Sequence, residues 1–256
     1  MAHIICITNQ KGGVGKTTTA INLSAALAVS EKKTLLVDCD PQGNATTGMG
    51  QDKSSINKTL YNGLIGETDA KSLILNTEID FLKIIPSRIE LIGFEIEMMS
   101  DLNREKALKN LLAQIVDSFE YIIIDCPPSL SLLTVNSLTA ADYILIPLQC
   151  EFYALEGLGQ LLHTVKLVKQ RLNPCLEIAG ILLTMFDKRT NLSQQVAEEA
   201  GKYFKNLIFK TMIYRNVRLG EAPSFGKPIL LYDAVSTGAQ NYFNLAKEIM
   251  AGRCKK

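Results

Sequence analysis

The chain contains 256 residues, of which 47% are hydrophobic and 21% are charged. This is the composition of an ordinary globular protein, and it excludes disordered and collagen-like chains. The length allows one large domain or two small ones, with enough apolar side chains for a substantial core. With 27 basic and 26 acidic residues, the formal net charge of +1 argues against a nucleic-acid-binding protein when only the total is considered.

The two halves of the chain nevertheless differ in charge. Residues 1–128 hold 12 Lys and Arg against 16 Asp and Glu, whereas residues 129–256 hold 15 against 10. Between residues 160 and 220 there are 10 basic and 4 acidic side chains. A near-neutral chain with this distribution can still present a basic surface.

Neither membrane insertion nor a metal cluster is indicated by the sequence. No apolar run reaches the roughly 18 residues of a transmembrane helix, and the N-terminus lacks the charged region and cleavage site of a signal peptide. The six cysteines form no CxxC pair, and only two histidines accompany them. We therefore expect the cysteines to be small core residues of a protein in the reducing cytoplasm.

Short apolar runs alternate with segments of helical periodicity along the whole chain. The runs predict strands at 4–7, 35–37, 81–85, 121–124 and 143–146, with later candidates at 178–183 and 207–213. Apolar residues spaced three or four apart predict helices at 18–29, 108–116, 158–172 and 242–249. The polar region 50–80 is expected to be an irregular excursion on the surface.

Most of the predicted strands are continuously apolar, which is typical of strands covered by helices on both faces. Together with the strand–helix alternation, this predicts an α/β fold built on a doubly wound, mainly parallel sheet. We find no linker or internal repeat, so residues 1–256 are expected to form a single domain.

The strongest motif follows the first predicted strand and reads Gln10-Lys11-Gly12-Gly13-Val14-Gly15-Lys16-Thr17-Thr18. It departs from the P-loop pattern G-x-x-x-x-G-K-[ST] only at Gln10, and a predicted helix follows it. Its glycines let backbone N–H groups approach phosphate oxygens, and the helix N-terminus adds partial positive charge. We therefore predict that the loop from Lys11 to Thr18 binds the phosphates of ATP. Lys16 would reach the β- and γ-phosphates, and the Thr17 hydroxyl would bind Mg²⁺.

Three aspartates follow the strands that should flank this loop. Asp38 and Asp40 come at the end of the second predicted strand, and Asp125 ends the fourth. Ligands of open α/β sheets bind at the carboxyl ends of the strands, so these carboxylates should lie near the γ-phosphate. The apolar run before Asp125 has the form of a Walker B segment, whose carboxylate supports Mg²⁺, although such an Asp can also cap the next helix. Asp38 and Asp125 are our metal candidates with Thr17.

The second lysine of the loop, Lys11, gives the variant K-G-G-x-G-K-[ST]. The chain thereby resembles the deviant Walker A ATPases, a superfamily of P-loop NTPases that includes ParA/Soj, MinD and nitrogenase iron protein. The resemblance implies that Lys11 acts in catalysis on the nucleotide of a dimer partner. The alternative is that it neutralises phosphates of its own site. It also implies that Asp40 orients the attacking water in a first switch, and that Pro127 begins a second switch.

Further segments are similar to the ParA/Soj partition ATPases in particular, and together they span residues 4 to about 235. They are Asp38–Asn44, Ile123–Ser129, Tyr153–Leu158, Leu183–Asp187 and Arg215–Arg218. The resemblance implies a Mg²⁺-dependent ATPase, slow without its partner, that forms an ATP-dependent homodimer in the cytoplasm on the nucleoid. The dimer would bind non-specific double-stranded DNA, and a ParB-type centromere-binding protein would stimulate hydrolysis and release it.

The resemblance also assigns residues beyond the phosphate site. Tyr214 and Asn216 should lie near the adenine, although the family usually has Pro where this chain has Tyr214. Arg189 and Arg218 match positions at which the family carries DNA-contacting arginines, and phosphate contacts need positive charge without base-reading geometry. Weaker candidates for the same face are Lys188, Lys202, Lys205 and Lys210.

Three other functions compete with DNA partition. A MinD-like membrane-cycling ATPase would need a basic amphipathic C-terminal helix, but only six residues follow Met250. An iron–sulfur electron-transfer dimer would need a second cysteine ligand beside Cys126. A scaffold that binds nucleotide without turnover would show no DNA-stimulated phosphate release.

Overall fold

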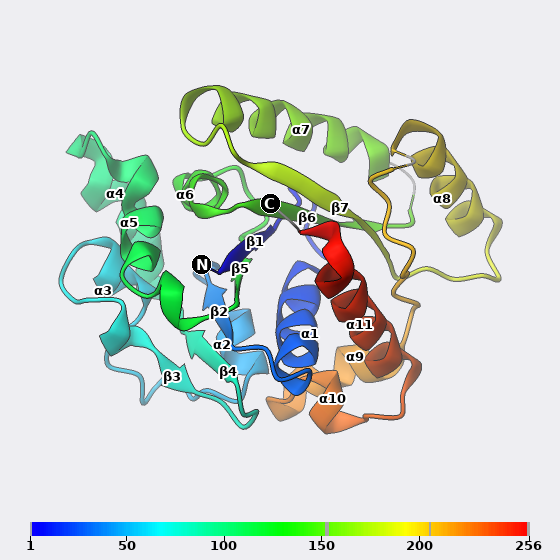
Figure 1. Ribbon diagram of the computed structural model, residues 1–256, viewed down its shortest axis with the longest axis horizontal. Coiled ribbons are helices and arrows are strands. Elements are labelled where there is room, and N and C mark those ends of the chain that lie inside the picture. The colour runs from blue at the N-terminus through cyan, green and yellow to red at the C-terminus, as the bar shows by residue number, and fades with distance from the viewer. Residues whose placement is uncertain (1, 152–153, 205, 255–256) are drawn as a thin grey trace.

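The computed structural model describes residues 2–151, 154–204 and 206–254. At its centre is a seven-stranded sheet in the order β3-β4-β2-β5-β1-β6-β7 (Figure 1). All neighbouring strands run parallel except β3, which is antiparallel to β4. The strands are β1 (His3–Ile7), β2 (Thr34–Asp38), β3 (Leu75–Asn76), β4 (Leu82–Ile85), β5 (Tyr121–Asp125), β6 (Tyr143–Gln149) and β7 (Glu177–Thr184).

Helices cover both faces of the sheet, as the continuously apolar strands predict. On one face α1 and α11 pack side by side, and on the other α5, α6 and α7 cover the strands (Figure 1). The helices are α1 (Lys16–Val29), α2 (Asn44–Gly48), α3 (Leu60–Leu64), α4 (Gly93–Glu97), α5 (Ala107–Ala113), α6 (Leu132–Ala140), α7 (Ala154–Arg171), α8 (Asn191–Phe204), α9 (Val217–Glu221), α10 (Ile229–Tyr232) and α11 (Thr237–Glu248).

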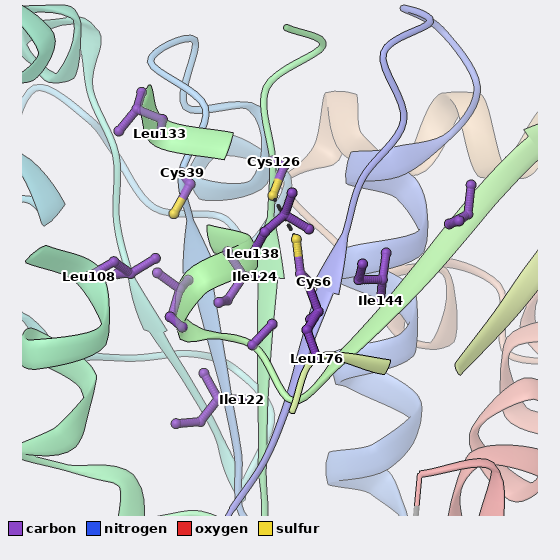
Figure 2. Packing of buried hydrophobic residues seen from close by; sticks show 14 of the residues in the cluster. Cys6, Cys39, Leu108, Ile122, Ile124, Cys126, Leu133, Leu138, Ile144 and Leu176 are labelled. Atoms are coloured by element: carbon purple, nitrogen blue, oxygen red, sulfur yellow. Dashed lines mark hydrogen bonds between the residues drawn. The ribbon is translucent and has the colours of Figure 1, made fainter. Parts of the chain in front are cut away.

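The core on the α6 side contains four cysteines. Three of them, Cys6, Cys39 and Cys126, lie among leucine and isoleucine side chains at the carboxyl ends of β1, β2 and β5 (Figure 2). The sulfur atoms of Cys6 and Cys126 are 3.2 Å apart, and burial raises the pKa of Cys6 well above its usual value. The expectation of core cysteines is confirmed for five of the six, while Cys175 is exposed.

One predicted strand is wrong. The segment 207–213 runs beside β7 but forms only an isolated bridge, between Ile181 and Ile208. The pairing with β7 is interrupted because the N–H groups of Lys210 and Thr211 donate to the carboxylate of Glu248, at 2.9 and 3.1 Å. Backbone hydrogen bonding to β7 resumes only at Ile213, whose N–H donates to the Leu183 carbonyl at 2.9 Å.

The region 50–80 is also more ordered than its polar composition suggests. It contains α3 and β3, and it contributes several fully or nearly fully buried apolar side chains to the core. These side chains are Ile56, Leu60, Leu64, Leu73 and Ile79. The short elements escape prediction because each is too brief to show a period. Among the described residues no helix is long and apolar enough to cross a bilayer.

Candidate nucleotide site

The P-loop joins the central strand β1 to α1. Gly13 and Gly15 adopt φ angles of 74° and 87°, in the left-handed region that favours glycine. A Cβ added at Gly12 or Gly13 would meet no atom within 4 Å, so this part of the loop borders open space. The Thr184 hydroxyl donates to the Val14 carbonyl at 2.9 Å and ties the loop to β7. The loop therefore offers an anchored cradle of backbone N–H groups to an anion.

Lys16 begins α1 and turns back over the loop. Its Nζ donates to the Lys11 carbonyl at 3.0 Å, and the residue is only 7% exposed. Burial lowers the pKa of Lys16, while the nearby carboxylates of Asp125 and Asp40 act in the opposite direction. A largely buried ammonium held at the mouth of an anion cradle suits the terminal phosphates of a nucleotide.

Asp38 and Asp125 lie directly opposite each other at the carboxyl ends of β2 and β5, where they are partners in the strand register. Asp125 is fully buried, and neither of its carboxylate oxygens has a hydrogen-bond partner of normal geometry among the described residues. Burial and the charge of Asp38 raise the pKa of Asp125 well above its usual value, and the Thr17 hydroxyl opposes the shift. A buried, unpartnered carboxylate beside Thr17 has the donor chemistry that Mg²⁺ requires, and the bound ion would neutralise the charge there.

Asp38 differs from Asp125 because hydrogen bonds occupy both of its oxygens. Oδ2 accepts from the backbone N–H and the hydroxyl of Thr46, both at 2.7 Å, and Oδ1 accepts from the Asp40 N–H at 3.2 Å. The Thr46 hydroxyl in turn accepts from the Ser87 N–H at 2.9 Å. Burial raises the pKa of Asp38 to about 6 despite these bonds. Asp38 thus holds the segment that follows β2, and no motif in the sequence points to the roles of Thr46 or Ser87.

Asp40 lies in the loop that Asp38 holds. It is 7% exposed, and its Oδ1 accepts from the Gln42 N–H at 2.9 Å. Gly43 closes this loop at a φ of 61°, and a Cβ there would come within 2.7 Å of the Ser87 carbonyl oxygen. The glycine is therefore required by both conformation and space, which fixes the loop that carries Asp40.

Lys11 extends away from its own loop toward the end of β6. Its Nζ lies 3.4 Å from Oε2 of Glu151, and both side chains are partly exposed. Glu151 also accepts a hydrogen bond from the Gln149 side chain, while the Lys11 N–H donates to Asn9 at 3.1 Å. The two loop lysines thus point to different partners, and Glu151 is a site residue that the sequence did not single out.

A cavity of about 170 Å³ opens beside the P-loop, where a nucleoside would follow the phosphates. Tyr214 and Asn216, the expected adenine residues, line it together with Gly15 and Thr18. Tyr242 forms part of the wall, and its hydroxyl is 3.3 Å from that of Thr19. The structure therefore brings the phosphate loop and the two predicted base contacts to one cavity.

The two predicted DNA-contacting arginines are both paired with carboxylates. Arg189 is 86% exposed at its side chain and binds Asp187 through Nε and Nη2, at 3.0 and 2.7 Å. Arg218, on α9, lies 3.0 Å from Glu221 and 3.6 Å from Asp233. Of the other residues named from the sequence, Tyr153 and Lys205 lie outside the described residues.

Comparison with known proteins places this site in a family. A family described as AAA domain matches residues 2–178. The chromosome partitioning protein ParA of Myxococcus xanthus (strain DK1622) is 55% identical over 250 residues, which cover 98% of this chain and 88% of the relative. The sporulation initiation inhibitor protein Soj of Bacillus subtilis (strain 168) is 56% identical over 251 residues, which cover 98% and 99%. The chain belongs to the ParA/Soj family of partitioning ATPases.

A solved structure with a bound nucleotide analogue shares the overall fold of the chain. Cobyrinic acid a,c-diamide synthase from Mycobacterium smegmatis, with a bound ATP analogue and magnesium, superposes with a TM-score of 0.86 at 35% identity, covering 98% of this chain and 95% of that one. The P-loop fold expected from the sequence is confirmed. This member of the ParA/Soj family is an ATPase, like its relative the chromosome-partitioning ATPase Soj of Treponema pallidum (strain Nichols).

Proposed function

We propose that this protein is a nucleotide-switched DNA-partition ATPase. ATP closes a sandwich homodimer, the dimer binds non-specific double-stranded DNA on the nucleoid, and a ParB-type centromere-binding protein stimulates hydrolysis and so releases it. The observation that carries the proposal is the divergence of the two loop lysines. Lys16 stays with its own loop, whereas the Lys11 ammonium lies outside it on Glu151. Lys11 is therefore available to a nucleotide in a second subunit.

The residues of the site have distinct parts in hydrolysis under this proposal. Backbone N–H groups of residues 12–17 and the Lys16 ammonium bind and orient the phosphates. Thr17 and Asp125 would hold Mg²⁺, which supplies charge neutralisation on the phosphate oxygens, and Asp38 keeps the first switch in place. Asp40 orients the attacking water, and Tyr214 and Asn216 border the base.

The basic second half of the chain supports the DNA-binding part of the proposal. A shallow hollow is lined by Lys188, Arg189 and Arg215 together with Asp187 and Tyr214. Tyr214 and Arg215 also line the nucleoside cavity, so this basic hollow adjoins that cavity. Such an arrangement suits DNA binding that depends on the bound nucleotide, with affinity that falls steeply as salt rises.

The test compares DNA binding with ATP, with ADP and without nucleotide, over a salt series. We expect tight, salt-sensitive binding to an unrelated duplex only with ATP. Asp40→Ala should keep the ATP dimer on DNA, because hydrolysis no longer releases it, whereas Lys16→Ala should bind neither nucleotide nor DNA. Equal DNA affinity in all three nucleotide states would overturn the proposal.

A further inference from the structure

Residues 88–105, called here the acidic segment, expose a stripe of apolar side chains. Ile89, Ile92, Ile96, Met99 and Leu102 are between 52% and 95% exposed. Neighbouring members of the stripe are three or four residues apart, so α4 and the short helical turns beside it present the first four on one side. Single exposed apolar residues are ordinary on a protein surface, but five within fourteen residues form a patch.

The core does not explain this stripe, because other residues of the same segment already anchor it. Leu91 and Phe94 are fully buried, and Met98 packs against the core from its edge. Burying these side chains is sufficient to hold the segment against the domain. Ile96 and Met99 can therefore be replaced without disturbing the core, and their apolar character calls for a second explanation.

The charge of the acidic segment is opposite to that of the region proposed to bind DNA. It holds five acidic residues against Arg88 and Arg104, and both arginines pair with neighbouring glutamates. Figure 1 places α4 at one end of the molecule, and α8 and α9 toward the other. An apolar stripe among carboxylates disfavours DNA and complements a basic amphipathic segment of another protein.

The acidic segment contacts the element that follows Asp125 and shares a hollow with the loop that follows Asp40. Glu95 accepts a hydrogen bond from the Leu132 N–H at 3.0 Å, at the start of α6, which follows Asp125 along the chain. Glu95, Met99, Arg104 and Glu105 of the acidic segment line a groove of about 520 Å³. Its other walls come from α6 and from the C-terminal part of α7 with Leu172, and they include Arg171. At the opposite end, Ile89 borders a hollow that Pro41 and Gln42 line, directly after Asp40. A molecule lying along the segment would thus touch the neighbourhood of both switches.

We infer that the acidic segment, with the groove beside α6 and α7, is the docking surface for a basic amphipathic segment of the protein partner that stimulates hydrolysis. This inference rests on the proposed function. The apolar face of the partner segment covers Ile92, Ile96 and Met99, and its basic side chains face the surrounding carboxylates. The hydrogen bond to Leu132, and the hollow that Ile89 shares with Pro41, place such a partner where it can influence Asp125 and Asp40.

The test uses the full-length chain and the cognate ParB-type protein. The variant Ile96→Lys/Met99→Lys removes two apolar side chains from the stripe and adds two positive charges. Val235→Lys, at a residue that is 96% exposed and outside the acidic segment, is the matched control. We expect the double variant to bind the labelled ParB-type protein about tenfold more weakly or worse and to need correspondingly more of it for stimulation. Its ATP-dependent dimerisation, DNA binding and basal ATPase rate should stay at wild-type values.

A second variant tests the negative charge of the acidic segment separately from its apolar side chains. Glu97→Gln/Asp101→Asn neutralises two carboxylates while keeping side chains of similar size. We expect slower association with the ParB-type protein and a weaker dependence of binding on salt, with a smaller loss of affinity than for the double lysine variant.

Three outcomes would overturn the inference. The first is unchanged binding and stimulation of the double lysine variant. The second is loss of its ATP-dependent dimerisation in sedimentation, which would assign the stripe to a second copy of the chain. The third is that the wild-type protein binds DNA in an ATP-dependent manner but neither binds the ParB-type protein nor hydrolyses ATP faster in its presence. Loss of nucleotide-dependent DNA binding in the wild type would instead contradict the proposed function itself.

Discussion

The Nζ of Lys11 lies 3.4 Å from Oε2 of Glu151, across the opening of the P-loop and at the end of β6. Because the side chains are 38% and 43% exposed, water screens the interaction and limits its strength. The ion pair is therefore weak enough to break if, as in the proposed homodimer, a nucleotide on a second subunit offers a stronger anion.

Glu151→Gln should strengthen ATP-dependent dimerisation. The exposed ion pair is worth at most about 1 kcal/mol, so its loss should raise the association constant by up to about fivefold. Sedimentation equilibrium with a non-hydrolysable ATP analogue measures the change. Glu120→Gln breaks a comparably exposed pair with Lys32 and should have no effect. Weaker dimerisation of Glu151→Gln would show that Glu151 itself contacts the partner.

Asp125→Asn should stabilise the nucleotide-free protein at neutral pH and abolish Mg²⁺-dependent ATP binding. Because burial raises the folded-state pKa of Asp125, its stabilising contribution is present below the unfolded pKa and is lost as pH rises through the folded value. Asp38, raised from 3.8 to about 6, acts in the same direction. From Asp38 alone the wild type should therefore lose on the order of 1 kcal/mol of stability between about pH 5.5 and 7.5, and Asp125 adds to the loss in the same direction.

Urea denaturation at the two ends of this pH range measures the effect. Asp125→Asn should be more stable than wild type at the higher pH, with a smaller difference at the lower pH, and Asp117→Asn on the surface should change neither. Mg²⁺ and ATP should stabilise the wild type more as pH rises, because the ion binds the ionised carboxylate. A destabilised Asp125→Asn would mean that the ionised carboxylate has a stabilising partner in the nucleotide-free protein.

The phosphate site is well predicted because the information for it is local in the chain. A strand, a glycine loop and a helix N-terminus stand next to one another, and Asp38 and Asp125 each end an apolar run. Parallel pairing of β2 with β5 then brings the two aspartates into register. The roles of Thr46 and Glu151 could not be predicted in the same way. Thr46 lies in the five-residue helix α2 and Glu151 lies just after β6, and neither belongs to a periodic pattern or a motif.

Competition for backbone donors explains the failed strand at 207–213. The apolar residues there satisfy a strand pattern, but the partner of the Lys210 N–H is Glu248, a carboxylate thirty-eight positions away that no window of the sequence connects to it. The orientation of the exposed apolar stripe of residues 88–105 could not be predicted from its sequence pattern either. Its spacing resembles a core-facing helix, and only the structure reveals that part of it faces outward.

Arg189→Ala and Asp187→Asn should change DNA affinity in opposite directions. The bidentate pair lowers the pKa of Asp187 to about 2, so the carboxylate is ionised and neutralises Arg189 at physiological pH. Removing the arginine should weaken DNA binding and reduce the slope of log K against log salt by about 0.9 for each DNA phosphate that is no longer neutralised, once per subunit. Removing the carboxylate charge should free the arginine and strengthen binding.

Fluorescence anisotropy with a labelled duplex across a salt series measures both changes. Lys32→Ala, which also removes an exposed cation, should leave the slope unchanged because Lys32 lies beside Glu120 and away from the basic hollow. An unchanged slope for Arg189→Ala would show that this arginine does not contact DNA phosphates.

Tyr214→Ala should weaken both ATP binding and DNA binding. The ring of Tyr214 borders the nucleoside cavity, and the Lys188 ammonium lies over it, 4.9 Å from its centroid. Phe186 packs against the same ring edge-on, with centroids 5.8 Å apart. Without the ring, an exposed cation–π interaction of about 0.5–1 kcal/mol is absent, which corresponds to a roughly two- to fivefold decrease of DNA affinity in the ATP state.

The control for Tyr214→Ala is an equivalent interaction elsewhere in the chain. Lys247 lies 4.6 Å from the Phe243 centroid, and Phe243→Ala should change stability without a selective effect on DNA binding. Tyr214→Phe keeps the ring face and should behave as wild type toward DNA. Calorimetry of ATP binding and anisotropy of DNA binding should therefore show both affinities falling together in Tyr214→Ala. If only ATP binding fell, with DNA affinity of the ATP-saturated protein unchanged, Tyr214 would serve the nucleotide alone.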